Sequence, residues 1–415
     1  MNNIIQFIKD FNSNKGGYVF LSFVIEKLIG LFNAIYLVRL ISKEDFGLIT
    51  LISSLFAVTI TLNGFGAIQA LLRYGSIADG ENNKNNLTQY LFRNGIKKHI
   101  LLTICFLLIA VCYEIKFEGI WPIALWFTVR FLGYFFYTFI LNYYRIHHHN
   151  KKFSSISIFV NCIGSLITLL LTLKLNTSGY LIGLAFTPWL SLIFYKKNIF
   201  EKSGLKRNTI DLKELWDYAI KSAINYGLAE ILIVLDIFLI GLFLSETEVA
   251  NYKIAIILPM NIIFLSSVFI QTDFPKLVSK SNDKIYLKNY IRSYQQLFIP
   301  IGIIFLIVGY LIKDWIISFV FGNSYEDVGN LFFIILIAVI SNMLMRNLYS
   351  NLLSAVGLAK QNTKIAIFSI LVMALLSLSL IPLLGIIGAA LALSITFIST
   401  GIFSLILFKK YLKSL

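Results

Sequence analysis

The sequence has little charge, and charge is what a water-exposed surface needs. Only 14% of its 415 residues are Asp, Glu, Lys or Arg, whereas 58% are hydrophobic, and the mean hydropathy is +0.79. A soluble domain has about a quarter of its residues charged and fills its core with far fewer apolar residues. The composition therefore excludes a soluble protein and predicts an integral membrane protein.

Cysteine and the motifs of ATP-driven or metal chemistry are also scarce. Cys105, Cys112 and Cys162 all lie in apolar stretches, where an odd number of thiols suits packing better than a disulfide framework. No G-x-x-x-x-G-K-[ST] motif occurs, which excludes an ATP-driven pump. Three histidines at 147–149 could suggest a metal site, but consecutive helical residues cannot converge on one ion and no Cys or carboxylate cluster accompanies them. We interpret them as a solvated basic loop and expect neither metal nor cofactor.

Acidic residues are outnumbered, with 21 Asp and Glu against 36 Lys and Arg, for a formal net charge of +15. With a cytoplasmic N-terminus, 26 of the 36 cations fall on inner connections, six on outer connections and four within apolar spans. Because Lys and Arg concentrate on the cytoplasmic side, we expect both termini to be cytoplasmic. Anionic lipid attracts such residues, so the positive charge does not require nucleic acid as a partner.

Long apolar runs are what the sequence has in abundance. A membrane-spanning helix takes about 20 apolar residues. Twelve runs are predicted to span the membrane, at about 17–40, 47–72, 98–115, 119–144, 153–174, 179–196, 216–244, 250–272, 294–312, 328–356, 363–384 and 385–408. The first run is too long for a cleavable signal peptide and is expected to stay as an anchor. The predicted fold class is an all-α polytopic membrane protein with twelve transmembrane helices.

The longest inner connection divides these spans into two sets of six. We predict an N-terminal six-helix bundle over 1–196, a cytoplasmic linker over 197–215 and a C-terminal six-helix bundle over 216–415. The first span of each half is followed by a serine and acidic residues, as LISKED at 40–45 and LSETE at 244–248. The fourth span of each half holds a single arginine, Arg130 or Arg346. Repeats of this kind build transporters around a central cavity.

Polar side chains recur along single faces of several spans, at the helical spacing of three or four residues. Intramembrane charges usually mark a substrate or ion path, whereas Ser, Thr and Asn also serve as packing contacts between helices. The candidate substrate-binding residues are Lys27, Arg130, Tyr134, Tyr137, Asn161, Lys221, Asn225, Asn342, Arg346 and Tyr349. Lys27 and Lys221 could instead extend their long side chains to the inner surface.

Arginine in both halves suits an anionic ligand, because a guanidinium binds phosphate through two hydrogen bonds and stays charged at any relevant pH. The neighbouring Tyr and Trp offer flat apolar faces to a sugar ring. Glu26, Asp236 and Glu230 are candidate ion-coupling residues, since a desolvated carboxylate can carry a proton. The alternative is that these acids pair with Arg or Lys, which we favour for Glu230.

Three segments resemble a known family: RLISKEDFG at 39–47, GFGAIQALLRYGS at 64–76 and LSETEVANYKIA at 244–255. They are similar to the polysaccharide-transporter branch of the multidrug/oligosaccharidyl-lipid/polysaccharide exporter superfamily, especially bacterial O-antigen flippases. The resemblance, which extends over 16–410, implies two bundles around a cavity of alternating opening in the bacterial inner membrane. It implies transport, without catalysis, of an undecaprenyl-pyrophosphate-linked glycan for lipopolysaccharide biosynthesis, with a proton or sodium gradient as driving force. Membrane lipids and a polysaccharide polymerase are the other expected partners.

Three alternatives stay open. A multidrug or cation antiporter of the same superfamily would need an acidic cavity, and four buried cations against three acids disfavour it. A membrane polysaccharide polymerase would be an enzyme with a sizeable outer loop, which the predicted short outer connections do not provide. A flippase for a lipid-linked peptidoglycan precursor would share the anionic substrate but usually has more than twelve helices.

Overall fold

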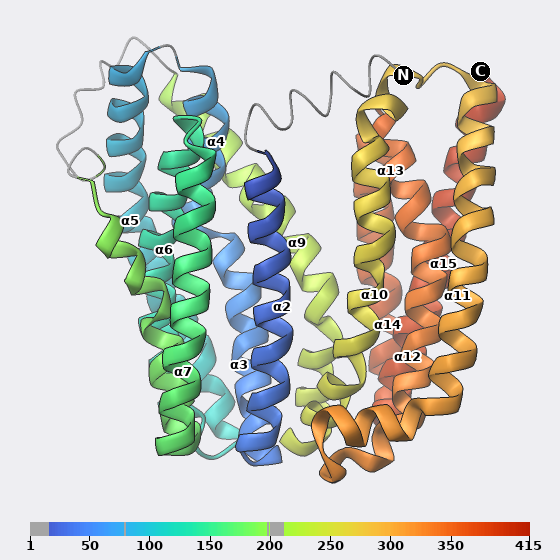
Figure 1. Cartoon of the computed structure of the whole chain (residues 1–415), viewed down its shortest axis with the longest axis horizontal. Coiled ribbons are helices and arrows are strands. Elements are labelled where there is room, and N and C mark those ends of the chain that lie inside the picture. Colours follow the sequence, from blue (N-terminus) through green and yellow to red (C-terminus); the bar gives the residue numbers. More distant parts are fainter. Residues whose placement is uncertain (1–15, 79, 197–198, 200–210) are drawn as a thin grey trace. The chain divides into compact units, whose positions relative to one another are not determined.

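The computed structural model describes residues 16–78, 80–196, 199 and 211–415, which are helical almost throughout and contain no strand (Figure 1). The α-helices are α2 Gly16–Leu40, α3 Lys43–Thr61, α4 Ala67–Ile77, α5 Glu81–Cys112, α6 Ile120–Ile146, α7 Asn150–Phe186, α9 Leu212–Phe243, α10 Glu246–Ser279, α11 Lys284–Phe321, α12 Gly329–Ser341, α13 Leu348–Ala355, α14 Ala359–Leu384 and α15 Ile386–Ser414. Short 3-10 segments are η1 Asn63–Phe65, η2 Tyr113–Ile115, η3 Thr187–Phe194 and η4 Asn323–Val328, and the π-helical turn η5 Asn342–Asn347 joins α12 to α13. The predicted all-α fold is confirmed.

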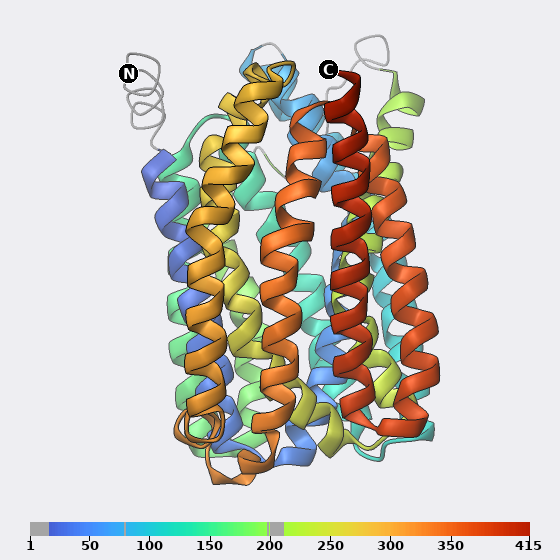
Figure 2. The same ribbon diagram turned by 90° about the vertical axis from the view of Figure 1, so that its right-hand side faces the viewer.

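The chain divides into two compact units, Met1–Glu230 and Ile231–Leu415, and the boundary falls inside α9. In the first unit α2 packs against α7, and α6 packs against both α5 and α7. In the second unit α15 packs against α12 and α14, as the orange and red helices of Figure 2 show. Most of the predicted linker at 197–215 lies outside the described residues, and the division into two six-helix bundles stays a prediction.

Ten helical segments of the described residues are long and apolar enough to cross a membrane, by length and composition. They coincide with predicted spans, and the segment Asn150–Phe194 holds two of them, which are separated by a non-helical residue at Asn176. The apolar runs therefore correspond to helices of a multi-pass membrane protein. The count of twelve spans and the cytoplasmic location of the termini stay predictions.

The prediction of one continuous helix over 47–72 is wrong, because the chain breaks between α3 and α4. Gly64, Phe65 and Gly66 all have positive φ. A Cβ built on Gly66 would lie 1.9 Å from the carbonyl oxygen of Ala219, at the start of α9. The backbones of two helices approach so closely here that only a glycine fits, and its left-handed conformation turns the chain.

Helix α5 begins at Glu81, well before the predicted apolar span at 98–115. Its first turns are polar on the outside, but Leu87 and Leu91 are fully buried. They belong to the core of the first unit, which α4, α5, α6 and α7 form together with the first turns of α9. The inner connection predicted between these spans is therefore largely helical, because two leucines one turn apart give a polar helix a buried face.

Two hairpins, one in each unit, share the same backbone geometry. Helix α7 is interrupted at Asn176 (φ 50, ψ −132), and α14 meets α15 at Gly385 (φ 59, ψ −141). Three residues later each hairpin has a glycine, Gly179 or Gly388, whose Cβ would lie 2.0 or 2.2 Å from the carbonyl oxygen of the leucine eight residues earlier. The same tight turn thus occurs in both units, which supports the repeat indicated by the sequence.

A second pair of hairpins matches as well. Ser42 and Ser245 are the N-caps of α3 and α10, and their hydroxyls accept hydrogen bonds from the backbone N–H of Asp45 at 3.1 Å and Glu248 at 3.4 Å. Both first turns also carry acids, which the positive end of the helix dipole favours. The repeated serine and acid pattern in the sequence is therefore a helix cap used twice.

Asn176 offers a test of this shared geometry, because its φ and ψ lie in a region that glycine adopts far more readily. We expect Asn176→Gly to stabilise the protein by about 1 kcal/mol and Gly385→Asn to destabilise it by a similar amount. No atom lies within 4 Å of a Cβ built on Gly385. The effect of Gly385→Asn therefore measures the cost of the backbone conformation, without a contribution from a clash of Cβ. Thermal unfolding midpoints in detergent would measure both effects, and shifts of the same sign would contradict the prediction.

Candidate functional site

A hydrogen-bonded network joins α2, α6 and α7 in the first unit. The Ser157 hydroxyl on α7 donates to Oε1 of Glu26 on α2. The hydroxyls of Tyr137 and Ser157 lie 3.1 Å apart, and Asn161 Nδ2 donates to the Tyr137 hydroxyl at 3.2 Å. The structure therefore brings together Glu26, Tyr137 and Asn161, which the sequence placed on three different spans.

Arg130 lies next to this network on α6. Its Nη1 donates to the carbonyl oxygen of Leu184 at 2.8 Å, and its guanidinium carbon lies 5.3 Å from the centre of the Phe56 ring. Tyr134, Tyr137 and Tyr180 lie near the guanidinium. Arg130 is thus a cation held by aromatic rings and a backbone carbonyl, an arrangement that stabilises a charge away from water.

The carbonyl that Arg130 binds is free for a reason visible in the sequence. In a regular α-helix the carbonyl of Leu184 would accept a hydrogen bond from the N–H four residues later, at position 188. That residue is Pro188, which has no N–H and is the second residue of the 3-10 segment η3. Arg130 therefore takes the place of the missing backbone donor.

Arg346 lies in the π-helical turn of the second unit, and its guanidinium carbon is 5.7 Å from the centre of the Phe397 ring on α15. Among the residues that the structure describes, the guanidinium donates no hydrogen bond and has no carboxylate within 4.0 Å. Asn342, one turn earlier, is 7% exposed, and its side-chain amide likewise makes no hydrogen bond within the described ranges. Arg346 and Asn342, both predicted from the sequence, are thus adjacent hydrogen-bond donors without an acceptor in the described part of the chain.

Contacts from neighbouring helices hold the π-helical turn in place. The Tyr294 hydroxyl on α11 donates to the carbonyl oxygen of Met343 at 2.9 Å, and Asn347 Nδ2 donates to the Ser266 hydroxyl on α10 at 2.8 Å. A Cβ built on Gly401 of α15 would lie only 2.7 Å from the Met345 side chain. Such turns depart from the regular α-helix and often occur at functional sites.

Of the other predicted binding residues, Tyr134 lies beside Arg130 and Tyr137, and the rest lie apart from these two groups. Lys221 is exposed and pairs with Asp217 at 2.7 Å, one turn earlier on α9, as expected for a side chain that extends to the surface. Tyr349 is buried, and its hydroxyl accepts a hydrogen bond from Gln295 Nε2 at 3.4 Å. Tyr134 is half-buried, with its ring packed on those of its neighbours. The two remaining candidates are exposed, Lys27 and Asn225.

Among the ion-coupling candidates, Asp236 is the buried one, with 1% of its surface exposed. The Tyr252 hydroxyl on α10 donates to Oδ2 of Asp236 at 2.5 Å, and the N–H of Ile237 donates to Oδ1 at 2.8 Å. The sequence analysis did not predict Tyr252 as the partner of Asp236. Helices α9 and α10 are joined by a short turn around Ser245, so residues at similar sequence distances before and after this turn lie at similar depth along the two helices. Glu230 is half-buried at the end of the first unit.

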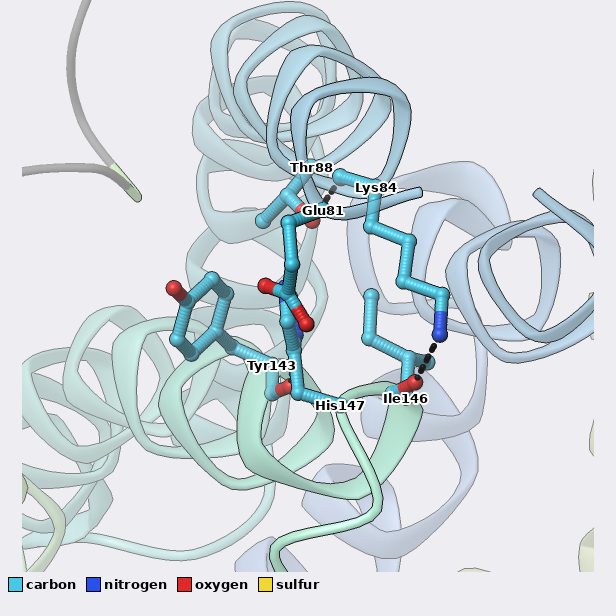
Figure 3. A network of polar contacts seen from close by, with 6 residues as sticks. All are labelled: Glu81, Lys84, Thr88, Tyr143, Ile146 and His147. Carbon is cyan, nitrogen blue, oxygen red and sulfur yellow. Dashed lines mark hydrogen bonds and ion pairs between the residues drawn. The ribbon is translucent and has the colours of Figure 1, made fainter. Parts of the chain in front are cut away.

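The interpretation of residues 147–149 as a solvated loop is wrong for the first of them. The His147 side chain is 2% exposed, whereas the other two histidines are exposed. Its Nδ1 lies 2.8 Å from the Tyr143 carbonyl oxygen and its Nε2 lies 3.1 Å from Oε2 of Glu81. Figure 3 shows Glu81 of α5 next to His147 at the end of α6. The helical extension of α5 brings Glu81 to this place. Within the described residues, no three His, Cys, Asp or Glu side chains group as a metal site.

Burial lowers the pKa of His147, an effect that the Tyr143 carbonyl and Glu81 oppose and that Lys84 and His149 increase. The folded chain then takes up this proton at a lower pH than the unfolded chain does. The stability due to His147 is therefore present above the pKa of the unfolded state and is lost as the pH falls through the lowered pKa.

We expect the unfolding midpoint to fall more steeply in the wild type than in His147→Gln as the pH goes from about 7 to about 5. His148→Gln is the matched control, because its side chain is exposed and should leave the wild-type profile unchanged. A steeper fall in His147→Gln than in the wild type would contradict the sign of the effect. Unfolding midpoints across the pH series provide the measurement.

Several solved structures described as transporters or flippases share the fold of this chain. A structure described as the lipid II flippase MurJ in an inward closed conformation aligns with a TM-score of 0.69 and 18% identity, over 94% of this chain and 87% of that one. An inward-facing multidrug resistance MATE family transporter of the MOP superfamily aligns with a TM-score of 0.66 and 13% identity, over 94% and 95%. A MOP superfamily transporter from Pyrococcus furiosus, described by the reverse polarity of its binding pocket, aligns with a TM-score of 0.53 and 11% identity, over 97% and 93%. At these identities the likeness shows the fold alone.

The family follows from the sequence match. No curated protein matches the chain. A family model described as "Polysaccharide biosynthesis protein" matches residues 36–330, which is more than half of the chain and includes Arg130 and Asp236. With its multi-pass helical fold in common with MOP superfamily transporters, the chain belongs to the polysaccharide biosynthesis protein family.

Proposed function

We propose that this protein is a flippase that moves an undecaprenyl-pyrophosphate-linked oligosaccharide, such as an O-antigen repeat unit, across the bacterial inner membrane. Membership of the family supports a role in polysaccharide biosynthesis, and the fold supports transport. The MurJ structure is described as a lipid II flippase, so a lipid-linked substrate is within the range of this fold. The protein works by alternating access, coupled to a proton or sodium gradient.

The observation that carries the proposal is that the Arg346 guanidinium has no hydrogen-bond acceptor among the described residues. A guanidinium within an apolar helix is costly unless a partner compensates it, and in the described residues Arg346 has only the face of Phe397. A pyrophosphate supplies oxygens that accept two hydrogen bonds from one guanidinium. An unused cation in this position therefore favours an anionic ligand and repels a cationic one.

A multidrug antiporter is the second candidate, since a MATE transporter shares the fold. Recognition of a drug cation requires a carboxylate that is available to it. Glu26 and Asp236 instead accept hydrogen bonds from Ser157 and Tyr252. The transporter described by its reversed pocket polarity supports the idea that charge distinguishes functions on this fold. An arginine without a hydrogen-bond acceptor among the described residues, together with carboxylates that already accept hydrogen bonds, favours an anionic substrate and hence the flippase.

Transport by the wild-type protein tests the proposal. Purified protein in liposomes should expose a labelled undecaprenyl-pyrophosphate oligosaccharide at the opposite leaflet, where an impermeant glycosidase cleaves it, faster than in protein-free liposomes. A proton or sodium gradient should accelerate the process. Transport of a cationic dye without transport of the lipid-linked glycan would overturn the flippase in favour of the antiporter. A glycan rate unaffected by both gradients would contradict ion coupling alone.

A further inference from the structure

The two intramembrane arginines differ in what they already bind, and we infer that the pyrophosphate of the substrate binds at Arg346 and Asn342, whereas Arg130 binds no anion. This assignment rests on the proposed function, since it places one part of that substrate at one site. The sequence alone treated the two arginines as equivalent, because each is the single mid-span arginine of its half.

Arg130 already donates one hydrogen bond within the protein, whereas Arg346 donates none among the described residues. The Nη1 of Arg130 satisfies the Leu184 carbonyl that Pro188 leaves without a backbone donor. A phosphate would compete with this carbonyl for the guanidinium, and loss of the hydrogen bond would leave the carbonyl without a partner inside a helix bundle, which is unfavourable. Arg130 therefore holds the bend at the end of α7.

The electrostatic surroundings of Arg130 also disfavour an anion. Glu26 is joined through the Ser157 hydroxyl to Tyr137, one of the tyrosines near the guanidinium. A phosphate placed there would be repelled by Glu26 whenever this carboxyl group is ionised. The rings and hydroxyls of this group suit the uncharged face of a sugar instead.

Arg346 has the opposite surroundings. A guanidinium has five N–H donors, and no hydrogen bond from Arg346 occurs in the described part of the chain. The amide of Asn342 adds two donors from the same helical face, one turn away. Donors from both side chains can hold the oxygens of a pyrophosphate, with Arg346 binding through two parallel hydrogen bonds.

The π-helical turn orients this pair before any ligand arrives. Asn347, the residue after Arg346, donates to the hydroxyls of Ser266 at 2.8 Å and Ser267 at 3.3 Å. The Tyr294 hydroxyl fixes the other end of the turn through the Met343 carbonyl. A turn anchored at both ends positions its donors at little further entropic cost, and such preorganisation improves affinity.

Binding of undecaprenyl pyrophosphate to the full-length protein in detergent tests the assignment, with undecaprenol as the matched lipid that lacks phosphate. The wild type should bind the pyrophosphate and not the alcohol, and inorganic pyrophosphate should compete. Arg346→Gln should weaken binding about tenfold or more, and Asn342→Ala and Arg346→Lys by less. Lys364→Gln is the control, since it removes one exposed cation from the second unit. Thermal unfolding of each variant confirms that it is folded.

Arg130→Gln separates this inference from the proposed function. We expect it to retain binding of undecaprenyl pyrophosphate, because the probe carries no sugar. A loss in Arg130→Gln as large as that in Arg346→Gln would overturn the assignment and leave the flippase proposal standing. If the wild type bound undecaprenol as well as undecaprenyl pyrophosphate, both the assignment and the anionic substrate would be overturned.

Discussion

Gly66→Ala is expected to destabilise the protein by about 4 kcal/mol or more, or to prevent folding, because overpacking adds to backbone strain. The added Cβ would lie 1.9 Å from the carbonyl oxygen of Ala219, which is less than any non-bonded contact allows. The glycine also has φ 84, a left-handed conformation that costs an alanine roughly 1 to 2 kcal/mol. Neither helix can move away easily, because both belong to the core of the first unit.

Gly119→Ala is the matched control, since Gly119 has the same φ of 84 but no atom within 4 Å of a Cβ built on it. Gly119→Ala should lower the free energy of unfolding only by the cost of a left-handed alanine, roughly 1 to 2 kcal/mol. The yield of monodisperse protein and the thermal unfolding midpoint measure both variants. Equal losses at the two glycines would show that α4 and α9 do not approach as closely as the structure indicates.

This contact matters because α9 belongs to both units and its first turns are attached to the first. Lys98 Nζ lies 2.9 Å from the centre of the Trp216 ring, and the guanidinium of Arg73 lies 4.7 Å from that of Tyr218. Cation–π contacts of this kind, together with the buried Ala219, hold the start of the helix in place. Gly66→Ala therefore disturbs the packing of α9 within the first unit.

Tyr252→Phe is expected to have the second largest effect, a destabilisation of about 2 to 3 kcal/mol. It removes the hydroxyl that donates to Oδ2 of Asp236 at 2.5 Å, and that carboxyl has 1% exposure and hence little access to water. Asp236→Asn should cost less, because an amide oxygen still accepts the hydrogen bond. The two substitutions together should cost less than their sum, since each removes the same interaction. Tyr310→Phe, at an exposed tyrosine of the second unit, should leave stability unchanged.

The same pair of residues tests the coupling proposal. If Asp236 carries the coupling ion, Asp236→Asn should abolish the acceleration of transport by a proton or sodium gradient in liposomes. Tyr252→Phe should retain the response, because the carboxyl is still present. An Asp236→Asn variant that responds to a gradient as the wild type does would exclude this residue as the coupling site. The remaining candidates would then be Glu26 and Glu230.

The helices could be predicted because a membrane dictates the length and composition of each span, independently of tertiary contacts. The break at Gly64 to Gly66 could not, since it depends on the approach of Ala219 from a distant part of the sequence. The same is true of the start of α5, where polar residues cover a buried face formed by Leu87 and Leu91. Windows of apolar residues miss such helices.

The candidate site could be predicted in its residue types but not in its pairings. Pro188 indicates that the Leu184 carbonyl lacks its helix partner, yet nothing in the spacing identifies Arg130 as the donor, 54 residues away. The partner of Asp236 was within reach of sequence reasoning, because a short turn sets Tyr252 at a similar depth. Only the structure shows that Arg130 donates a hydrogen bond to a backbone carbonyl, whereas Arg346 donates none among the described residues.

The π-helical turn also has a consequence for the length of the chain, because it holds one residue more than a regular α-helix would place there. Deleting one residue within Asn342–Asn347 would restore the regular helix and rotate all that follows by about 100° about the axis. Helix α13 would then present a different side to α10 and α15, against which it packs. If Arg346 and Asn342 bind a pyrophosphate as proposed, relatives that share this site should keep the insertion, and a one-residue gap in an alignment would then mark transporters that lack it.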